Sequence, residues 1–192
     1  KDIVRMSVAR ACRLQPLEEI DLPVNKAALV VGGGLAGMTS ALSIANQGHE
    51  VHLLEKEADL GGVARRIHYT LEGLDVQAYL LDLVQRVYRH PQIQIYTEAL
   101  IDEVKGYVGN FVTKVKSEGI ASEIKHGATI IATGAEEYVP TEYLYGRNSR
   151  VLTHLEVEER VKNSDGQLLQ AESLVMIQCV GSRDETRPYC SR

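Results

Sequence analysis

The sequence predicts an α/β fold in three layers, built on a mainly parallel sheet with an antiparallel β-meander. An apolar run at 26–32 leads through a glycine turn into a helical pattern at 35–47, and a second apolar run follows at 50–55. Strand, helix and strand within about thirty residues form a βαβ unit, whose strands pair in parallel. Three short runs between 101 and 125, separated by glycine-containing turns, predict the meander.

Each element has a local signal. The first long helix repeats apolar residues at helical spacing and ends at Gly48, the second ends before Pro91, and Thr153 is placed to cap the third. In chain order the predicted elements are a short helix at 4–14, a linker at 17–23, a strand at 26–32, a helix at 35–47, a strand at 50–55, a helix at 75–89, a strand at 92–96, meander strands at 101–107, 110–116 and 120–125, a strand at 129–134, a helix at 153–162 and a last strand at 173–178.

Composition excludes several classes of protein. The 192 residues carry a net charge of -5, which argues against a protein that tracks nucleic-acid phosphates. No apolar run reaches the ~20 residues that span a bilayer, so no membrane span is expected, and residues 1–13 lack the apolar core of a signal peptide. Three widely spaced cysteines do not form a disulfide framework, which favours a reduced, cytoplasmic protein. The first and last residues suggest a fragment of a longer polypeptide.

Gly32, Gly34 and Gly37 occupy the GxGxxG positions between the first strand and helix. This spacing provides a tight turn, room for a pyrophosphate against the backbone, and close packing of helix on strand. The helix N-terminus directs unpaired N–H groups at the phosphates, so the turn, Leu35 and Ala36 are expected to bind a pyrophosphate in a Rossmann-like domain. A plain strand–helix turn is the alternative.

Glu55, at the end of the second strand, selects the nucleotide. A carboxylate there accepts hydrogen bonds from ribose hydroxyls and repels a 2′-phosphate, which excludes NADP and leaves FAD or NAD. Two further segments favour FAD. Glu55 is followed by Gly61 and Gly62 in an E-x6-G pattern typical of two-dinucleotide flavoproteins, where this backbone wraps the ribityl chain and pyrophosphate. The segment Ala132-Thr133-Gly134 follows the meander, and its small residues allow backbone to approach the flavin.

Several longer segments resemble the A subunit of heterodisulfide reductase (HdrA) and its relatives. They are VVGGGLAGMTSALSIANQGHEVHLLEKE, KGYVGNF, ATGAEEY, YGRNSRVLTHLEVE and QCVGSRDETRPYCSR. The likeness runs from about residue 4 to 192, which is essentially the whole chain. The resemblance implies a thioredoxin-reductase-like flavoprotein of anaerobes that passes electrons between FAD and iron–sulfur clusters. It implies as partners the other subunits of such a complex, with ferredoxin or hydrogenase-type electron carriers. In methanogens the flavin of this family is held to bifurcate electrons between ferredoxin and the heterodisulfide of coenzymes M and B.

Lys56, next to Glu55, is expected to flank the ribose, and the resemblance implies that the backbone of Ile101 reaches the adenine. No residue is assigned as a catalytic acid or base. The chain departs from many family members in two places, because it has no cysteines in 74–79 and only Lys116-Ser117-Glu118-Gly119 where they carry a cysteine-rich insert. An iron–sulfur cluster is therefore not expected at either place, which argues against the complete electron-transfer path of the methanogenic complex.

The cysteines leave two interpretations open. Cys179 and Cys190 lie in the QCVGS…YCSR context, so Cys190 is a candidate ligand of an iron–sulfur cluster in a longer chain. Two cysteines cannot complete a four-thiolate site, so both are otherwise ordinary thiols, and no metal site is expected within these residues. Cys12 is expected to be a small buried hydrophobe.

Other polar residues carry weaker signals. His68 follows the Gly61-Gly62 loop and is expected to be solvated, with a flavin or partner contact as the alternative. Arg65 and Arg66 either contact the pyrophosphate, steer an acidic carrier protein or form a solvated charge pair.

The predicted domains are an N-terminal helix and linker at 1–25, an FAD-binding domain at 26–146, and the start of a second domain or a returning segment at 147–192. The function expected is an FAD-dependent oxidoreductase in which the cofactor does the chemistry. Two alternatives stay open: a non-catalytic electron-transfer or assembly module that is active only in a larger complex, and an NAD-binding domain without flavin.

Overall fold

The computed structural model describes residues 1–15, 21–117, 119–183, 185 and 187–189. Its central sheet has four parallel strands in the order β3-β2-β1-β7. Their bounds are Ala28–Val31 for β1, Val51–Leu54 for β2, Ile93–Tyr96 for β3 and Ala128–Ile131 for β7. In register, Val30 lies between Leu53 and Ile130. β2 is buried throughout, as expected of a strand covered on both faces.

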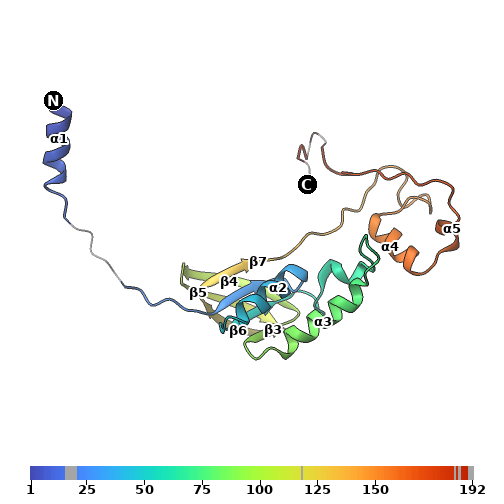
Figure 1. Ribbon diagram of the computed structural model, residues 1–192, viewed down its shortest axis with the longest axis horizontal. Helices are drawn as coiled ribbons and strands as arrows, with labels where there is room; N and C mark the ends of the chain where they lie inside the picture. The colour runs from blue at the N-terminus through green and yellow to red at the C-terminus, as the bar shows by residue number, and fades with distance from the viewer. Residues whose placement is uncertain (16–20, 118, 184, 186, 190–192) are drawn as a thin grey trace.

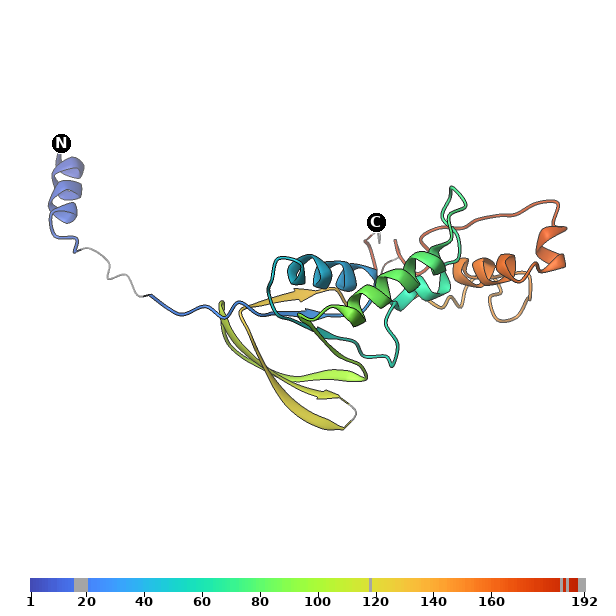
Figure 2. The same ribbon diagram turned by 60° about the horizontal axis from the view of Figure 1, so that its bottom comes forward.

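Two helices cover one face of this sheet. They are α2 (Leu35–Ala45) and α3 (Val76–Arg89), and both lie on the same side in Figure 2. Met38 from α2 and Leu83 from α3 are fully buried against Val30 and Leu53 in one apolar cluster. Asp75 is the N-cap of α3, and its carboxylate accepts hydrogen bonds from the N–H groups of Gln77 and Ala78. The amphipathic pattern therefore predicted both helices, and the sheet supplies the apolar surface that stabilises them.

The meander covers the opposite face. Its antiparallel strands are β4 (Ala99–Tyr107), β5 (Asn110–Ser117) and β6 (Ile120–His126), paired in that order. Val115 and Ile124 pack against Leu29 and Leu54 of the parallel sheet in a second apolar cluster. Figure 2 shows the three layers of helices, parallel sheet and meander. The predicted three-layer α/β architecture is confirmed.

The remaining elements are short. α1 (Asp2–Ala11) has no buried residue and lies away from the sheet in both views. A 3₁₀ helix, η1 (Gly62–Arg66), precedes α3, while α4 (His154–Lys162) and α5 (Gly166–Leu169) follow β7. Thr153 caps α4 as predicted, in a reciprocal pair with Glu156. Cys12, expected to be buried, is exposed, because nothing among the described residues covers this end of the chain.

One predicted strand is wrong. Residues 173–178 run without strand pairing, and Leu174, Val175 and Met176 are exposed. A strand requires a neighbour for its N–H and C=O groups, and this apolar run has none among the described residues. The strand expected at 129–134 is also shorter, because backbone pairing with β1 ends at Ile131. In the described part of the chain, no helix is long and apolar enough to cross a bilayer.

Candidate functional site

The glycine turn is held against two neighbouring segments. Gly32 has φ of 110°, and a Cβ added there would collide with the carbonyl of Ala132. A Cβ on Gly37 would collide with the carbonyl of Gly32. The first and third glycines are thus required by close approach, the third for packing α2 against β1 as the motif predicts. Ala132, predicted at the flavin end, lies directly against the turn.

Gly34 differs from these two because it faces open space. A Cβ added there would meet no atom within 4 Å, and Gly34 is the N-cap of α2 without a side-chain cap. No acidic residue lies in the first turn, and Leu35 and Ala36 are exposed. The N–H groups at this end are oriented for an anion, and the positive end of the helix dipole favours one. These residues therefore fit a bound pyrophosphate.

Glu55 is oriented into this turn. Its Oε2 accepts a hydrogen bond from the N–H of Gly33 at 2.7 Å, and its Oε1 accepts one from the N–H of Glu57 at 2.9 Å. The residue is 6% exposed. A carboxylate has about four acceptor positions, so two remain for ribose hydroxyls. Glu55 thus has a structural role in the turn beside its predicted ribose role. The spacing between Gly32 and Glu55 in the sequence did not reveal the structural role.

The Gly61-Gly62 loop lies beside the turn. The N–H of Gly61 donates to the carbonyl of Gly33 at 2.8 Å, and an isolated parallel bridge joins Gly61 to Gly34. A Cβ on Gly62 would lie 3.3 Å from the Cα of Gly34. Two glycine segments separated by some thirty residues of sequence therefore form one backbone surface, as the predicted cofactor site requires.

The other predicted residues surround this surface. Lys56 is half exposed and pairs with Glu136 at 3.1 Å, which joins the end of β2 to the segment after β7. Thr133 and Gly134 are exposed beyond β7. Ile101 lies in β4, whose first residue, Ala99, donates its N–H to the carbonyl of Glu55 at 2.9 Å. All of these segments converge at the carboxyl ends of β1, β2 and β7, where ligands of open α/β sheets bind.

The glycine motif did not predict the roles of two residues at the site. Gly33 is the first: a Cβ there would lie 2.5 Å from Cδ2 of Leu60 and 2.9 Å from Oε2 of Glu55. Gln77 is the second, because its amide donates hydrogen bonds to the carbonyls of Ala64 and Ile67 and so fastens η1 to α3. A polar residue at the start of an amphipathic helix is ordinary, so sequence alone could not identify Gln77.

The basic residues after Gly62 are paired. Arg65 lies 3.5 Å from Asp59, and Arg66 lies 3.2 Å from Glu137, and both arginine side chains stay partly exposed. The expectation of a solvated His68 is wrong, since the residue is 8% exposed. It lines a polar cavity of about 220 Å³ between η1 and α4. The packing of α4 against η1 buries His68, and that long-range contact left no trace in the local sequence.

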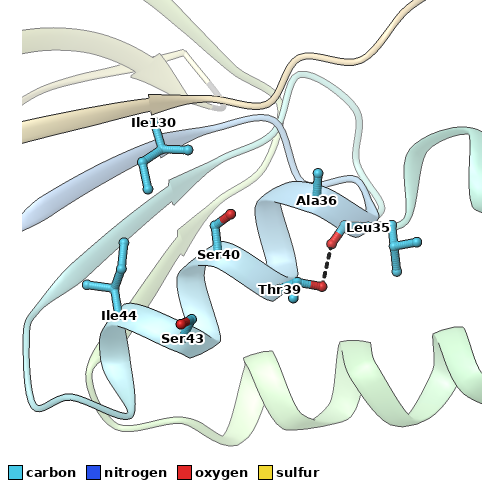
Figure 3. A pocket seen from close by; sticks show the side chains of 7 residues that line it. All are labelled: Leu35, Ala36, Thr39, Ser40, Ser43, Ile44 and Ile130. Carbon is cyan, nitrogen blue, oxygen red and sulfur yellow. Dashed lines mark hydrogen bonds between the residues drawn. The ribbon is translucent and has the colours of Figure 1, made fainter.

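A larger, shallow hollow of about 690 Å³ follows the outer side of α2 beside β7. Figure 3 shows Ile44 and Ile130 with Ser40 and Ser43 along it, and Thr39 donating its hydroxyl hydrogen to the carbonyl of Leu35. The hollow extends along the helix away from the glycine turn and reaches it only at Leu35 and Ala36. It adds no chemical group to the site.

Two buried histidines lie on the meander side of the sheet. His126 is fully buried, shares a hydrogen bond with the hydroxyl of Thr113 at 2.8 Å and stacks on Phe111. Burial lowers its pKa below the usual 6.5, although its contact with the carbonyl of Ala128 opposes this. Burial also lowers the pKa of His52, while the nearby Glu50 raises it. Both rings are therefore neutral at physiological pH.

The cysteines give no metal site in the described residues. Cys179 is a partly buried free thiol, and Cys190 lies outside the described residues. No group of three or more His, Cys, Asp and Glu side chains in the described parts could hold a metal ion.

Comparison with known proteins finds a matching domain family and several relatives. Residues 30–104 match the NAD(P)-binding Rossmann-like domain. The whole chain is 30% identical to the A subunit of the H(2):CoB-CoM heterodisulfide,ferredoxin reductase of Methanothermobacter marburgensis, covering 43% of that protein. It is also 30% identical to an iron-sulfur A subunit of the CoB--CoM heterodisulfide reductase of Methanopyrus kandleri, again covering 43%. The chain therefore spans less than half the length of these relatives.

Among solved structures, L-proline dehydrogenase from P. horikoshii overlaps 62% of this chain and 24% of its own. The TM-score is 0.50 and the identity 27%. Together with the observed strand order, this overlap supports the Rossmann-like fold class predicted from the glycine turn.

Proposed function

Because the chain is homologous over its whole length to the A subunit of heterodisulfide reductase, we propose that residues 26–146 form the FAD-binding domain of a flavin-dependent oxidoreductase. The observation that carries this proposal is the open position at Gly34, where the uncapped N-terminus of α2 and the Gly61-Gly62 backbone form one surface beside Glu55. A pyrophosphate fits the helix end, and an unphosphorylated ribose fits the carboxylate.

In this proposal each residue has a position along the cofactor. Gly32, Gly34, Leu35, Ala36 and Gly37 hold the pyrophosphate, and Glu55 accepts from the ribose. Lys56 flanks the ribose, while the backbone of Ile101 lies toward the adenine. Gly61 and Gly62 face the ribityl chain, and Ala132, Thr133 and Gly134 lie at the flavin end. A bound flavin would supply hydride and single-electron transfer, whereas the protein binds and orients it.

We further propose that electrons pass between this flavin and iron–sulfur partners in a cytoplasmic complex. The support is homology to components of heterodisulfide reductases, together with the C-terminal segment that carries Cys179 and Cys190. Residues 147–192 would then begin a second domain, and Cys190 would be a cluster ligand in the complete protein. The other components of the complex, and ferredoxin or hydrogenase-type carriers, are the proposed partners.

A visible absorption spectrum of the full natural protein tests the cofactor proposal. We expect the absorption bands of oxidised flavin, and FAD as the compound released on denaturation. If FAD neither co-purifies nor binds on reconstitution, the proposal fails. Binding of NAD in its place would support the NAD-domain alternative, because the same turn holds either dinucleotide.

Replacing Glu55 tests its role at the ribose. We expect Glu55→Ala to weaken FAD binding by at least about tenfold, since hydrogen bonds to a charged group are the stronger ones. Glu57→Ala is the matched control, because it removes a neighbouring exposed carboxylate. It keeps the backbone N–H of residue 57, which donates a hydrogen bond to Oε1 of Glu55. Unchanged affinity in Glu55→Ala excludes the ribose role.

Turnover separates an enzyme from a non-catalytic module. The full protein is mixed with NADH or NADPH and a dye acceptor, alone and together with its partner proteins. Steady reduction by the protein alone supports the oxidoreductase. Reduction only in the presence of the partner proteins supports a module that works within the complex.

A further inference from the structure

A carboxylate far along the chain holds the loop that leaves the glycine surface. Oε1 of Glu158, in α4, accepts hydrogen bonds from the N–H of His68 at 2.8 Å and the N–H of Tyr69 at 3.2 Å. The partners are separated by 90 and 89 residues in sequence. These two backbone bonds lower the pKa of Glu158, so the carboxylate is charged at neutral pH. One oxygen thus satisfies two consecutive N–H groups outside regular secondary structure.

The same loop is tied to α3 on its other side. Gln77 donates to the carbonyls of Ala64 and Ile67, and the carbonyl of His68 accepts from the N–H of Val76 at 2.9 Å. The backbone from η1 to residue 69 is therefore held between two helices. Figure 1 shows α4 beside the N-terminal end of α3, and α4 packs directly on η1.

This loop is continuous with the cofactor surface. η1 begins at Gly62, where an added Cβ would lie 3.3 Å from the Cα of Gly34, and it ends at Arg66, two residues before His68. Backbone hydrogen bonds connect the two ends of this segment, because the N–H of Ala64 donates to the carbonyl of Gly61 and the N–H of Ile67 donates to the carbonyl of Ala64, both at 3.2 Å. A displacement of His68 and Tyr69 would therefore reach Gly62 and Gly34 through these contacts.

We propose that Glu158 is a positioning residue for the cofactor loop, residues 61–69, and that it couples the docking of α4 to the environment of the bound flavin. The flavin part of this inference rests on the proposed function. Because α4 belongs to the segment beyond the Rossmann-like match at 30–104, the contact links the cofactor domain to the part of the chain that follows it.

The test uses the full natural protein with three variants. Glu158→Ala removes both acceptor contacts, Glu158→Gln keeps an oxygen acceptor without the charge, and Glu159→Ala removes the exposed neighbouring carboxylate as the matched control. Amide hydrogen exchange of His68 and Tyr69 is measured together with the visible circular dichroism of the flavin and the rate of FAD release.

We expect Glu158→Ala to speed exchange at both amides by about tenfold or more, to alter the flavin circular dichroism and to speed FAD release. Glu158→Gln should restore most of each property, and Glu159→Ala should resemble the natural protein. Unchanged exchange at these two amides in Glu158→Ala overturns the positioning role. Equal effects of Glu159→Ala also overturn it, because they would reflect loss of charge from α4 in general.

Two outcomes separate this inference from the proposed function. If the natural protein binds no FAD but Glu158→Ala still speeds exchange at His68 and Tyr69, the FAD proposal fails and the loop-positioning role stands. If FAD binds and Glu158→Ala leaves flavin circular dichroism and release unchanged, the coupling to the flavin is wrong while the FAD proposal stands.

Discussion

Oε2 of Glu55 accepts a hydrogen bond from the N–H of Gly33 at 2.7 Å, in a buried position that joins the end of β2 to the glycine turn. The carboxylate predicted to select the ribose therefore also fixes the shape of the turn that would hold the pyrophosphate. Since the two segments lie 22 residues apart, their geometry depends on the pairing of β1 with β2.

Gly33 is constrained by this contact. We expect Gly33→Ala to lower the free energy of unfolding by about 1–3 kcal/mol, because the methyl group would press on Leu60 and on the Glu55 carboxylate. It should also weaken FAD binding. Urea unfolding and FAD titration measure both effects. Gly166→Ala is the control, since a Cβ there meets no atom within 4 Å, and an equal loss in both variants would contradict the prediction.

Substitution of Gly34 and of Gly37 by alanine is expected to have different effects. A Cβ on Gly37 collides with the carbonyl of Gly32, so Gly37→Ala should destabilise the fold. A Cβ on Gly34 meets open space, and φ of -74° suits alanine, so Gly34→Ala should keep its stability. Its methyl group would instead occupy the space assigned to the pyrophosphate and weaken FAD binding. Thermal unfolding and FAD titration of both variants check the contrast; strong FAD binding by Gly34→Ala would argue against that space being the pyrophosphate site.

Gln77 should be a structural anchor of the cofactor loop. In Gln77→Leu the carbonyls of Ala64 and Ile67 lose the amide of Gln77, and the carbonyl of Ala64 keeps only the N–H of Ile67. We expect this loss to cost about 1–3 kcal/mol in the free energy of unfolding. Gln85→Leu is the matched control on the exposed side of the same helix, where surface substitutions change stability by about 0.5 kcal/mol or less. Chemical denaturation measures both variants, and similar values for the two would show that the Gln77 bonds contribute no net stability.

The buried histidines should make the fold sensitive to acid. Their pKa values are lowered in the folded protein, so below the usual pKa of 6.5 the unfolded state holds more protons than the folded state. The free energy of unfolding is therefore expected to keep its maximal contribution from these two rings above pH 6.5 and to decrease as the pH drops below 6.5. Around these rings, Glu50 opposes the shift at His52, while Thr113 and the carbonyl of Ala128 are the polar partners of His126.

Urea unfolding between pH 7.5 and 5.5 measures this dependence. The double variant His52→Gln, His126→Gln should show a smaller loss of stability over that range, whatever its stability at pH 7.5. His154→Gln removes an exposed histidine and should keep the natural dependence. A double variant that loses as much stability as the natural protein would refute the assignment to these two rings.

Much of the fold was predictable because it depends on local patterns. Helical spacing of apolar residues placed α2 and α3 within about two residues of their observed ends, and Thr153 was correctly predicted to cap α4. Glycine-containing turns placed the three strands of the meander. The strand predicted from the apolar pattern at 173–178 was wrong, because such a segment forms a strand only where a neighbouring strand pairs with its backbone.

By itself, the sequence determined the βαβ unit and the glycine turn, and it predicted the residues of the proposed dinucleotide site. These follow from periodicity and from the conformations that glycine alone adopts readily. Only the tertiary structure decided that Glu55 is oriented into the turn, that His68 is buried, and that Glu158 holds the loop beyond Gly62. Such contacts join a side chain to backbone N–H groups brought close by packing, and no local spacing encodes which distant N–H group needs a partner.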